Sequence, residues 1–149
     1  MTTEAQTQSD LMKRVGHRVL DEALTGRNID IFDETHSPDV VWHGPGGREL
    51  HGLAELKDMV SGYLEAFPDL RMTVEHEVAE GNLLATEWRA VGTHDGPLGD
   101  IPPTGKKIDF RGHVIARFER GKIVEEFEVF DELAMLRQIG VVDAEDLPA

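Results

Sequence analysis

The sequence contains no cysteine, only one tyrosine among 149 residues, and no apolar run approaching the ~20 residues that a membrane-spanning helix needs. Without cysteine the chain can form neither a disulfide bond nor a thiolate nucleophile. The N-terminal segment MTTEAQTQSD lacks the basic start and apolar stretch of a signal peptide. A cytoplasmic protein without a membrane partner is therefore predicted.

Basic residues are also scarce, since 15 lysines and arginines stand against 29 aspartates and glutamates, for a formal net charge of −14. Such a surface repels a phosphate backbone, so nucleic acid is not an expected partner. The same charge is a common means of keeping a protein soluble. The chain length favours a single domain with room for a core and a modest internal cavity.

The period of the apolar residues divides the chain into a helical first part and a strand-rich second part. Three helices and one short strand are predicted first, at residues 10–25, 29–35, 52–66 and 40–43. From Leu70 onward the period changes to two, which predicts four strands and then a helix capped by Asp131 and ended by Gly140. Helices segregated from antiparallel strands indicate an α+β fold, with a curved sheet covered by helices on one face.

The expected domain organisation is simple. Residues 1–9 are predicted to form a disordered leader, residues 10–141 a single domain, and residues 142–149 an acidic C-terminal tail.

The last strand carries two carboxylates on one face. Residues two apart on a strand share a face, so Val124, Glu126 and Glu128 are expected on one side. The other side is expected to carry Ile123, Glu125, Phe127 and Val129. A buried carboxylate is costly unless it is paired or protonated. If the first face is covered, acid–base chemistry is one explanation for its two glutamates.

Four segments, in this order, resemble one known family. They are AFPDL at Ala66–Leu70, GTHDG at Gly92–Gly96, IPPTGKK at Ile101–Lys107, and the closing GKIVEEFEVFDELAMLRQIG at Gly121–Gly140. From about Leu11 to Gly140 the chain is thereby similar to the SnoaL-like polyketide cyclases, within the nuclear-transport-factor-2-like superfamily. Because this fold hosts many functions, the resemblance points to a family rather than to one reaction.

The resemblance implies a cone: a curved mixed or antiparallel sheet, N-terminal helices over its concave face, a short C-terminal helix, and a cavity between them. It also implies a homodimer through the outer face of the sheet. The acid–base aspartate of the cyclases lies seven positions after the glycine of the GKI turn, which is Glu128 here. A cyclase histidine seven positions before that glycine falls on Val114. His113 beside it is the second predicted catalytic residue, although it shares the face of Glu128 only if a bulge intervenes.

The predicted substrate-binding residues are those whose chemistry suits a cavity: His43, Trp88, His94, Glu126 and Asp131. Trp88, like Trp42, can stack on a flat aromatic substrate or can simply belong to the core. Asp131 aligns with a carboxylate of the family and is equally placed to cap the last helix. The histidines form no metal-binding spacing such as HExxH, so neither a metal nor a cofactor is predicted.

Together these features predict a small, cofactor-independent enzyme acting on a small hydrophobic molecule. Glu128 would serve as general acid and base in the intramolecular aldol ring closure of a carbonyl-bearing metabolite. Two alternatives stay open. In the first, the same cavity hosts a different reaction on its substrate: epoxide opening, for which Asp131 or Glu126 would assist Glu128, or dehydration, isomerisation or hydroxylation. The domain can also be a non-catalytic binding or dimerisation module, which predicts a salt-bridged or exposed Glu128.

Overall fold

The computed structural model describes residues 3–143 and 145 and has the predicted α+β architecture. Its helical segments are α1 (Glu4–Arg18), the π-helix η1 (Val19–Thr25), α2 (Ile31–Thr35), the 3₁₀-helix η2 (Pro45–Gly47), α3 (Leu53–Ala66) and α4 (Glu132–Gln138). Its strands are β1 (His36–His43), β2 (Glu49–His51), β3 (Arg71–Glu80), β4 (Leu83–Thr93), β5 (Lys107–Glu119) and β6 (Lys122–Phe130). Within the described residues, no helix is both long and apolar enough to cross a membrane.

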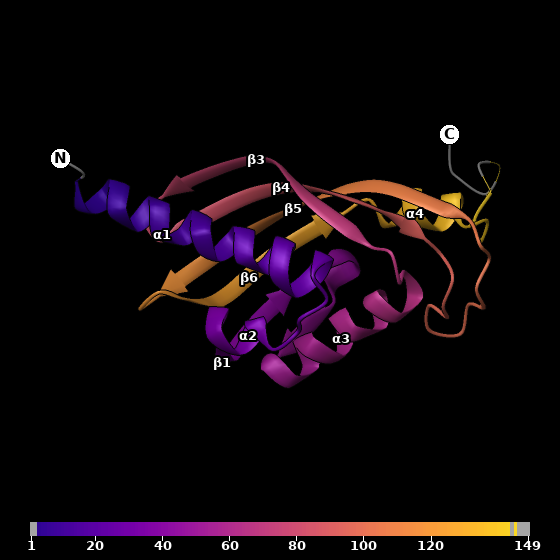
Figure 1. Ribbon diagram of the computed structural model, residues 1–149, viewed down its shortest axis with the longest axis horizontal. Coiled ribbons are helices and arrows are strands. Elements are labelled where there is room, and N and C mark those ends of the chain that lie inside the picture. The colour runs from indigo at the N-terminus through magenta and orange to yellow at the C-terminus, as the bar shows by residue number, and fades with distance from the viewer. Residues whose placement is uncertain (1–2, 144, 146–149) are drawn as a thin grey trace.

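The strands form one mixed sheet in the order β2-β1-β6-β5-β4-β3. Every neighbouring pair is antiparallel except β1 and β6, which run parallel. Figure 1 shows the long strands β3 to β6 curving together, with α1 crossing them and α2 and α3 packed beside β1. The last strand of the chain, β6, therefore lies in the interior of the sheet, between β1 and β5.

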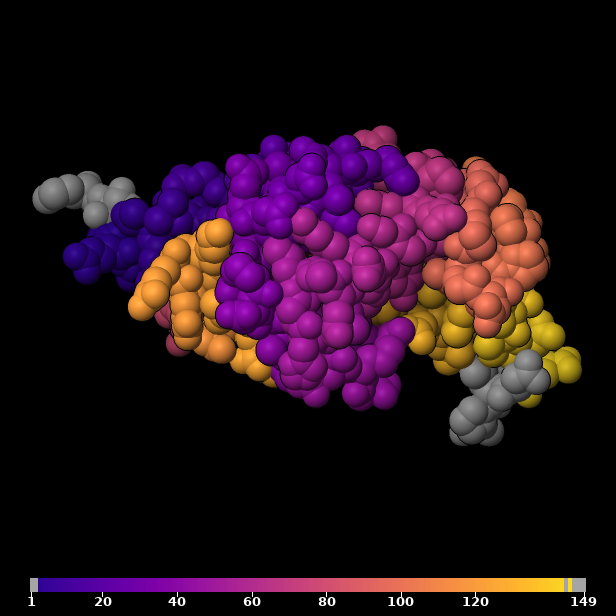
Figure 2. All heavy atoms as spheres, turned by 90° about the horizontal axis from the view of Figure 1, so that it is seen from below, coloured from indigo at the N-terminus to yellow at the C-terminus, as the bar shows by residue number. Residues whose placement is uncertain are grey.

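One face of this sheet is covered by helices and holds the core. Apolar side chains of α1, η1 and α3 meet inward-facing residues of every long strand, Trp42 and Trp88 among them, in one continuous cluster. In the space-filling view of Figure 2, the indigo-to-magenta residues of the first half of the chain cover most of the side shown. The opposite face of the sheet carries the exposed side chains of Ile115, Phe127 and Val129.

The first helix begins earlier than predicted. It starts at Glu4, with Thr3 as its N-cap, rather than near Asp10, so residues 4–9 are helical and not part of a disordered leader. Thr3 and Gln6 form a capping box, in which each side chain accepts a hydrogen bond from the other residue's backbone N–H. Residues 1, 2, 144 and 146–149, which include most of the predicted acidic tail, lie outside the described residues.

Ile123 does not lie on the outer face, as the strict alternation had predicted. Phe118 pairs with Ile123, but the preceding residue, Arg117, pairs with Glu125, so Val124 is an extra residue in β6. A bulge of this kind reverses the alternation locally. Ile123 is consequently buried, with 3% exposure, while Glu126 and Glu128 remain on the covered face.

Candidate active site

A small cavity lies between the covered face of the sheet and the helices. Its volume is about 100 Å³, and its lining is almost entirely apolar. The lining residues are Leu24, Met59, Val60, Tyr63, Phe67, Leu70, Met72, Trp88, Ala90, Phe110, Glu128 and Phe130. Glu128 is the one carboxyl group among these described residues, and Tyr63 is the other ionisable side chain of the lining.

Two indole groups fix the carboxylate of Glu128. Trp42 in β1 donates its Nε1–H to Oε1 at 2.9 Å, and Trp88 in β4 donates its Nε1–H to Oε2 at 2.9 Å. These are the only two tryptophans of the sequence. Because each carboxylate oxygen accepts one indole bond and keeps a free lone pair, the group is held in one orientation and can still exchange a proton with a ligand.

The environment of Glu128 raises the pKa of its carboxyl from 4.5 to about 7. Loss of hydration is the largest cause, and the negative charge of Glu126 adds to it, while the two indole donors act in the opposite direction. The Glu128 side chain is half-buried and lines the cavity. A carboxyl group with a pKa near neutrality can act as base and acid at physiological pH.

A glycine in the middle of β5 makes room for Trp88. Gly112 is paired with Trp88 on one side and Phe130 on the other. A Cβ atom at this position would lie 2.3 Å from Cζ2 of Trp88 and 2.7 Å from Cβ of Phe130. Gly112 is thus required by the indole ring that lies against it, rather than by a turn.

Gly112→Ala is therefore expected to destabilise the fold by about 1–3 kcal/mol, because the ring of Trp88 must move out of its site. The matched control is Gly62→Ala on the exposed face of α3, where an added Cβ meets nothing within 4 Å. That change should stabilise the helix by about 0.5–1 kcal/mol. Thermal unfolding followed by circular dichroism compares the two, and a Gly112→Ala protein as stable as wild type would contradict the tight packing.

Tyr63 and Arg48 add polar groups beside the apolar lining. Burial raises the pKa of Tyr63, which therefore keeps its phenolic proton. Its ring meets the cavity residue Phe130 edge-on, with centroids 6.3 Å apart. On another side of Phe130 the guanidinium carbon of Arg48 lies 5.9 Å from the ring centroid, and Arg48 is ion-paired with Glu132. Neither Tyr63 nor Arg48 was singled out from the sequence.

Glu126 lies on the same face as Glu128 but does not line the cavity. Its Oε1 is 2.7 Å from Nε2 of His36, the first residue of β1. His36 is almost fully buried, and β1 begins at this residue, four positions before the predicted strand at 40–43. The strand was not predicted to start at His36, because a strand is not expected to begin just before a proline such as Pro38.

His113 is the clearest correction among the predicted site residues. It pairs with Val129 on the outer face, is well exposed, and contacts Oε2 of Glu87 at 3.0 Å through its Nε2. β5 has no bulge near it that would turn the side chain inward. His113 therefore cannot reach the cavity and cannot be the second catalytic residue.

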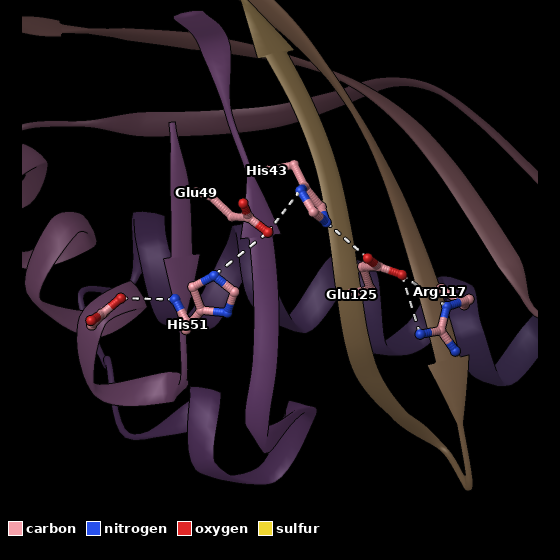
Figure 3. Close-up of polar contacts among 6 residues, drawn as sticks. His43, Glu49, His51, Arg117 and Glu125 are labelled. Atoms are coloured by element: carbon pink, nitrogen blue, oxygen red, sulfur yellow. Dashed lines mark hydrogen bonds and ion pairs between the residues drawn. The ribbon is translucent and has the colours of Figure 1, made fainter. Parts of the chain in front are cut away.

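His43 also lies on the outer face and not in a substrate site. Its ring stacks on Phe127 with centroids 4.7 Å apart, and its Nε2 contacts Oε2 of Glu125 at 2.8 Å. Figure 3 shows this contact within a surface network of polar groups that extends from His51 through Glu49 to Arg117. The hydrogen bond with His43 is the main cause that lowers the pKa of Glu125.

The two remaining predicted binding residues have structural roles. His94 is fully buried at the base of the loop between β4 and β5, where its Nδ1 lies 2.9 Å from Oγ1 of Thr104. Asp131 caps α4 by accepting a hydrogen bond from the backbone N–H of Ala134 at 3.0 Å, as one of its two readings predicted. Among the described residues, no group of three histidine, aspartate or glutamate side chains could hold a metal ion.

The chain is thus a cone-shaped α+β domain with one carboxyl group of raised pKa in an apolar cavity. Residues 15–139 match the family described as SnoaL-like polyketide cyclase. Because that match spans most of the chain, the protein belongs to this family. No protein with a curated description matches the sequence.

Solved structures similar to the whole domain support the same placement. A proposed SnoaL-like polyketide cyclase from Jannaschia sp. CCS1 has a TM-score of 0.86 and 22% identity, over 95% of this chain and 99% of that one, and shows the fold. AclR, a proposed hydroxylase from Streptomyces galilaeus, has a TM-score of 0.82 and 25% identity, over 94% and 90%. IdmH, a proposed polyketide cyclase from Streptomyces antibioticus, has a TM-score of 0.76 and 27% identity, over 87% and 99%.

Proposed function

We propose that this protein catalyses the intramolecular aldol ring closure of a hydrophobic, carbonyl-bearing metabolite, most concretely a polyketide ester. Glu128 serves as both general base and general acid. The observation that carries the proposal is a single carboxyl group of pKa about 7, held by two indole donors in an apolar cavity. No cofactor takes part.

The reaction needs two proton transfers, and one carboxyl group can perform both. The Glu128 carboxylate removes a proton from a carbon flanked by two carbonyl groups, which produces an enolate and a carboxylic acid. The enolate carbon attacks a second carbonyl carbon of the same molecule, forming the new carbon–carbon bond and an alkoxide. The alkoxide then takes the proton back from Glu128, so that the enzyme returns to its starting state.

The shape of the site supports a hydrophobic substrate whose reacting part alone is enclosed. An apolar cavity of about 150 Å³ binds benzene, and the cavity here is smaller, at about 100 Å³, so one ring enters it only when lining side chains move apart. The remainder of a larger polyketide extends past the lining residues. The protonated phenol of Tyr63 is a suitable hydrogen-bond donor for a substrate carbonyl oxygen.

The comparisons support a cyclase more than the other chemistries of the same fold. The family description names polyketide cyclases, as does that of IdmH, whereas AclR is described as a proposed hydroxylase. Epoxide opening needs a second acidic group at the same point as Glu128. Glu126 is bonded to His36 and Asp131 caps α4, and neither lines the cavity.

The non-catalytic alternative predicts a Glu128 that is salt-bridged or exposed. In the structure Glu128 is bonded to two neutral indole groups instead, and its carboxylate is surrounded by protein. A binding module gains nothing from a desolvated carboxyl with a pKa near neutrality, whereas general acid–base catalysis does.

The direct test uses an anthraquinone-type polyketide methyl ester and follows its ring closure by absorbance. Closure faster than in buffer, with turnover proportional to enzyme concentration, is the expected result. A rate equal to that in buffer would exclude the cyclase reaction for this substrate class, and mass-spectrometric identification of bound small molecules would then be the next step.

A cytoplasmic location of the protein remains a prediction.

We also propose that the protein is a symmetric dimer through the outer face of the sheet. Ile115 and Phe127 are paired neighbours there, with Val129 next along β6, and all three are exposed apolar side chains. A patch of this kind, rimmed by polar groups such as those of Figure 3, can be self-complementary about a two-fold axis.

Val129→Asp is expected to shift the protein from dimer to monomer at micromolar concentration, because it places a charge within that apolar patch. Light scattering coupled to size-exclusion chromatography gives the mass directly. Val141→Asp is the matched control, since Val141 is an exposed valine outside the sheet. A wild-type protein that elutes as a monomer would contradict the dimer.

A further inference from the structure

A second ionisable pair lies behind Glu128, and nothing in the proposed reaction uses it. His36 is 1% exposed, at the start of β1. Both of its ring nitrogens have partners: Nδ1 lies 2.9 Å from Oγ1 of Thr35, and Nε2 lies 2.7 Å from Oε1 of Glu126. Oγ1 of Thr35 also lies 3.0 Å from the carbonyl oxygen of Ile31.

These contacts fix the number of protons in the pair. A carbonyl oxygen only accepts, so the single hydroxyl proton of Thr35 is donated to Ile31. Nδ1 of His36 must then carry a proton and donate it to Thr35. The contact between Nε2 and Glu126 also needs one proton between two acceptor atoms. Whether that proton sits on the imidazole or on the carboxyl, the pair of His36 and Glu126 has no net charge.

The pair is placed where its charge matters to catalysis. Glu126 and Glu128 are two residues apart on one face of β6, which separates their backbones by roughly 6.6 Å. β1 contacts both carboxyl groups, because its His36 lies against Glu126 and its Trp42 donates to Glu128. The charge on Glu126 is already one cause of the raised pKa of Glu128.

In the described part of the chain, no other charged side chain makes a hydrogen bond or ion pair with His36 or Glu126. From α2 the neighbours are the Thr35 hydroxyl and the ring of Phe32, whose centroid is 4.8 Å from that of His36. From β5 the residue opposite Glu126 is Ala116. Along β6 the nearest ionisable group on the same face is Glu128. Among the described contacts, His36 is therefore the only group that neutralises Glu126.

We propose that His36 is a positioning residue that neutralises Glu126 and thereby keeps Glu128 in the protonation range where it can act as both base and acid. Its effect on catalysis rests on the function proposed above, but the coupling between the pair and Glu128 does not. His36 does not line the cavity, so it would act on Glu128 only through Glu126.

Two substitutions should move the titration of Glu128 in opposite directions. His36→Gln keeps hydrogen-bond donors for Glu126 but removes the positive partner, so Glu126 stays negatively charged beside Glu128. The Glu128 midpoint is then expected to rise by about one pH unit. Glu126→Gln keeps the bond to His36 but removes the negative charge, so the midpoint is expected to fall by about half a unit or more.

The two tryptophans provide a readout that does not depend on activity. Both indole N–H groups are bonded to Glu128, so their ¹H–¹⁵N NMR signals should titrate with it, near pH 7 in the wild type. Glu128→Gln is the control, and its indole signals should show no such titration. If the cyclase assay fails, these midpoints still test the coupling. If the assay succeeds, the acidic limb of kcat/KM should move with them.

Midpoints in His36→Gln and Glu126→Gln that agree with wild type within about 0.2 pH unit, or that move in the same direction, would overturn the proposal. Should either variant fail to fold, the imidazole ¹⁵N shifts of His36 in the wild-type protein decide instead. They are expected to show a protonated Nδ1 throughout the titration of Glu128. An unprotonated Nδ1 would contradict the assignment of protons on which the coupling depends.

Discussion

Replacing Glu128 by glutamine is expected to slow ring closure by about 10²–10⁴-fold, which is the usual contribution of general acid–base catalysis. The glutamine side chain has the same shape but can neither remove nor return a proton. Its carbonyl oxygen still accepts one indole N–H, whereas its amide group faces the other indole as a donor. The loss should therefore appear mainly in kcat, measured by the absorbance of the cyclised product.

The matched control for this experiment lies on the same strand. Glu125→Gln makes the identical chemical change on the outer face, where Glu125 contacts His43 and Arg117. Its rate should stay within about twofold of wild type, since surface ion pairs of this kind contribute little. If Glu128→Gln retains more than a tenth of the wild-type rate while folding normally, Glu128 is not the catalytic acid and base.

The stability of the wild-type protein is expected to fall as the pH rises from about 5 to 8, by an amount that Glu128→Gln does not show. The fold raises the pKa of Glu128 from 4.5 to about 7, so the folded state binds this proton more tightly than the unfolded state. The contribution is fully present below pH 4.5 and is lost as the pH passes through 7. Between pH 5 and pH 8 the loss amounts to about 2–3 kcal/mol, since each pH unit between pH 5 and the folded-state pKa of about 7 corresponds to about 1.4 kcal/mol.

Urea unfolding of both proteins at pH 5 and pH 8, followed by circular dichroism, measures this difference. Glu128→Gln also loses an indole bond, but that loss is the same at both pH values and cancels when they are compared. The net charge of −14 affects both proteins nearly equally. An identical pH dependence in wild type and variant would show that Glu128 titrates normally in the folded state.

Much of the fold could be predicted because each element follows its own local pattern. Helical spacing in α3, alternation in β4 and β5, and Asp131 before α4 each indicate the structure that is observed. The start of α1 was also within reach, since Thr3 and Gln6 have the capping-box spacing. The bulge at Val124 was not, because a regular alternation gives no sign of one inserted residue.

The site was only partly predictable, because its geometry depends on pairings between distant strands. Glu128 was found from its face and its place after the GKI turn, and alternation alone already placed His113 on the wrong face. The contacts of Glu128 with Trp42, 86 positions away, and of Glu126 with His36, 90 positions away, depend on the parallel pairing of β1 and β6. A parallel pairing between two strands so far apart in the sequence leaves no local pattern from which it could be predicted.

The central position of β6 has a consequence for the protein during its synthesis. Until this strand leaves the ribosome, β1 and β5 each present an unpaired edge, and the apolar face between them is uncovered. Strand edges of this kind pair readily with other chains. A nascent chain that stops before Gly121 should therefore be prone to aggregate and a natural client for chaperones. The strand that carries Glu128 is also the one that closes the sheet, so the cavity carboxyl group and the finished fold are completed together.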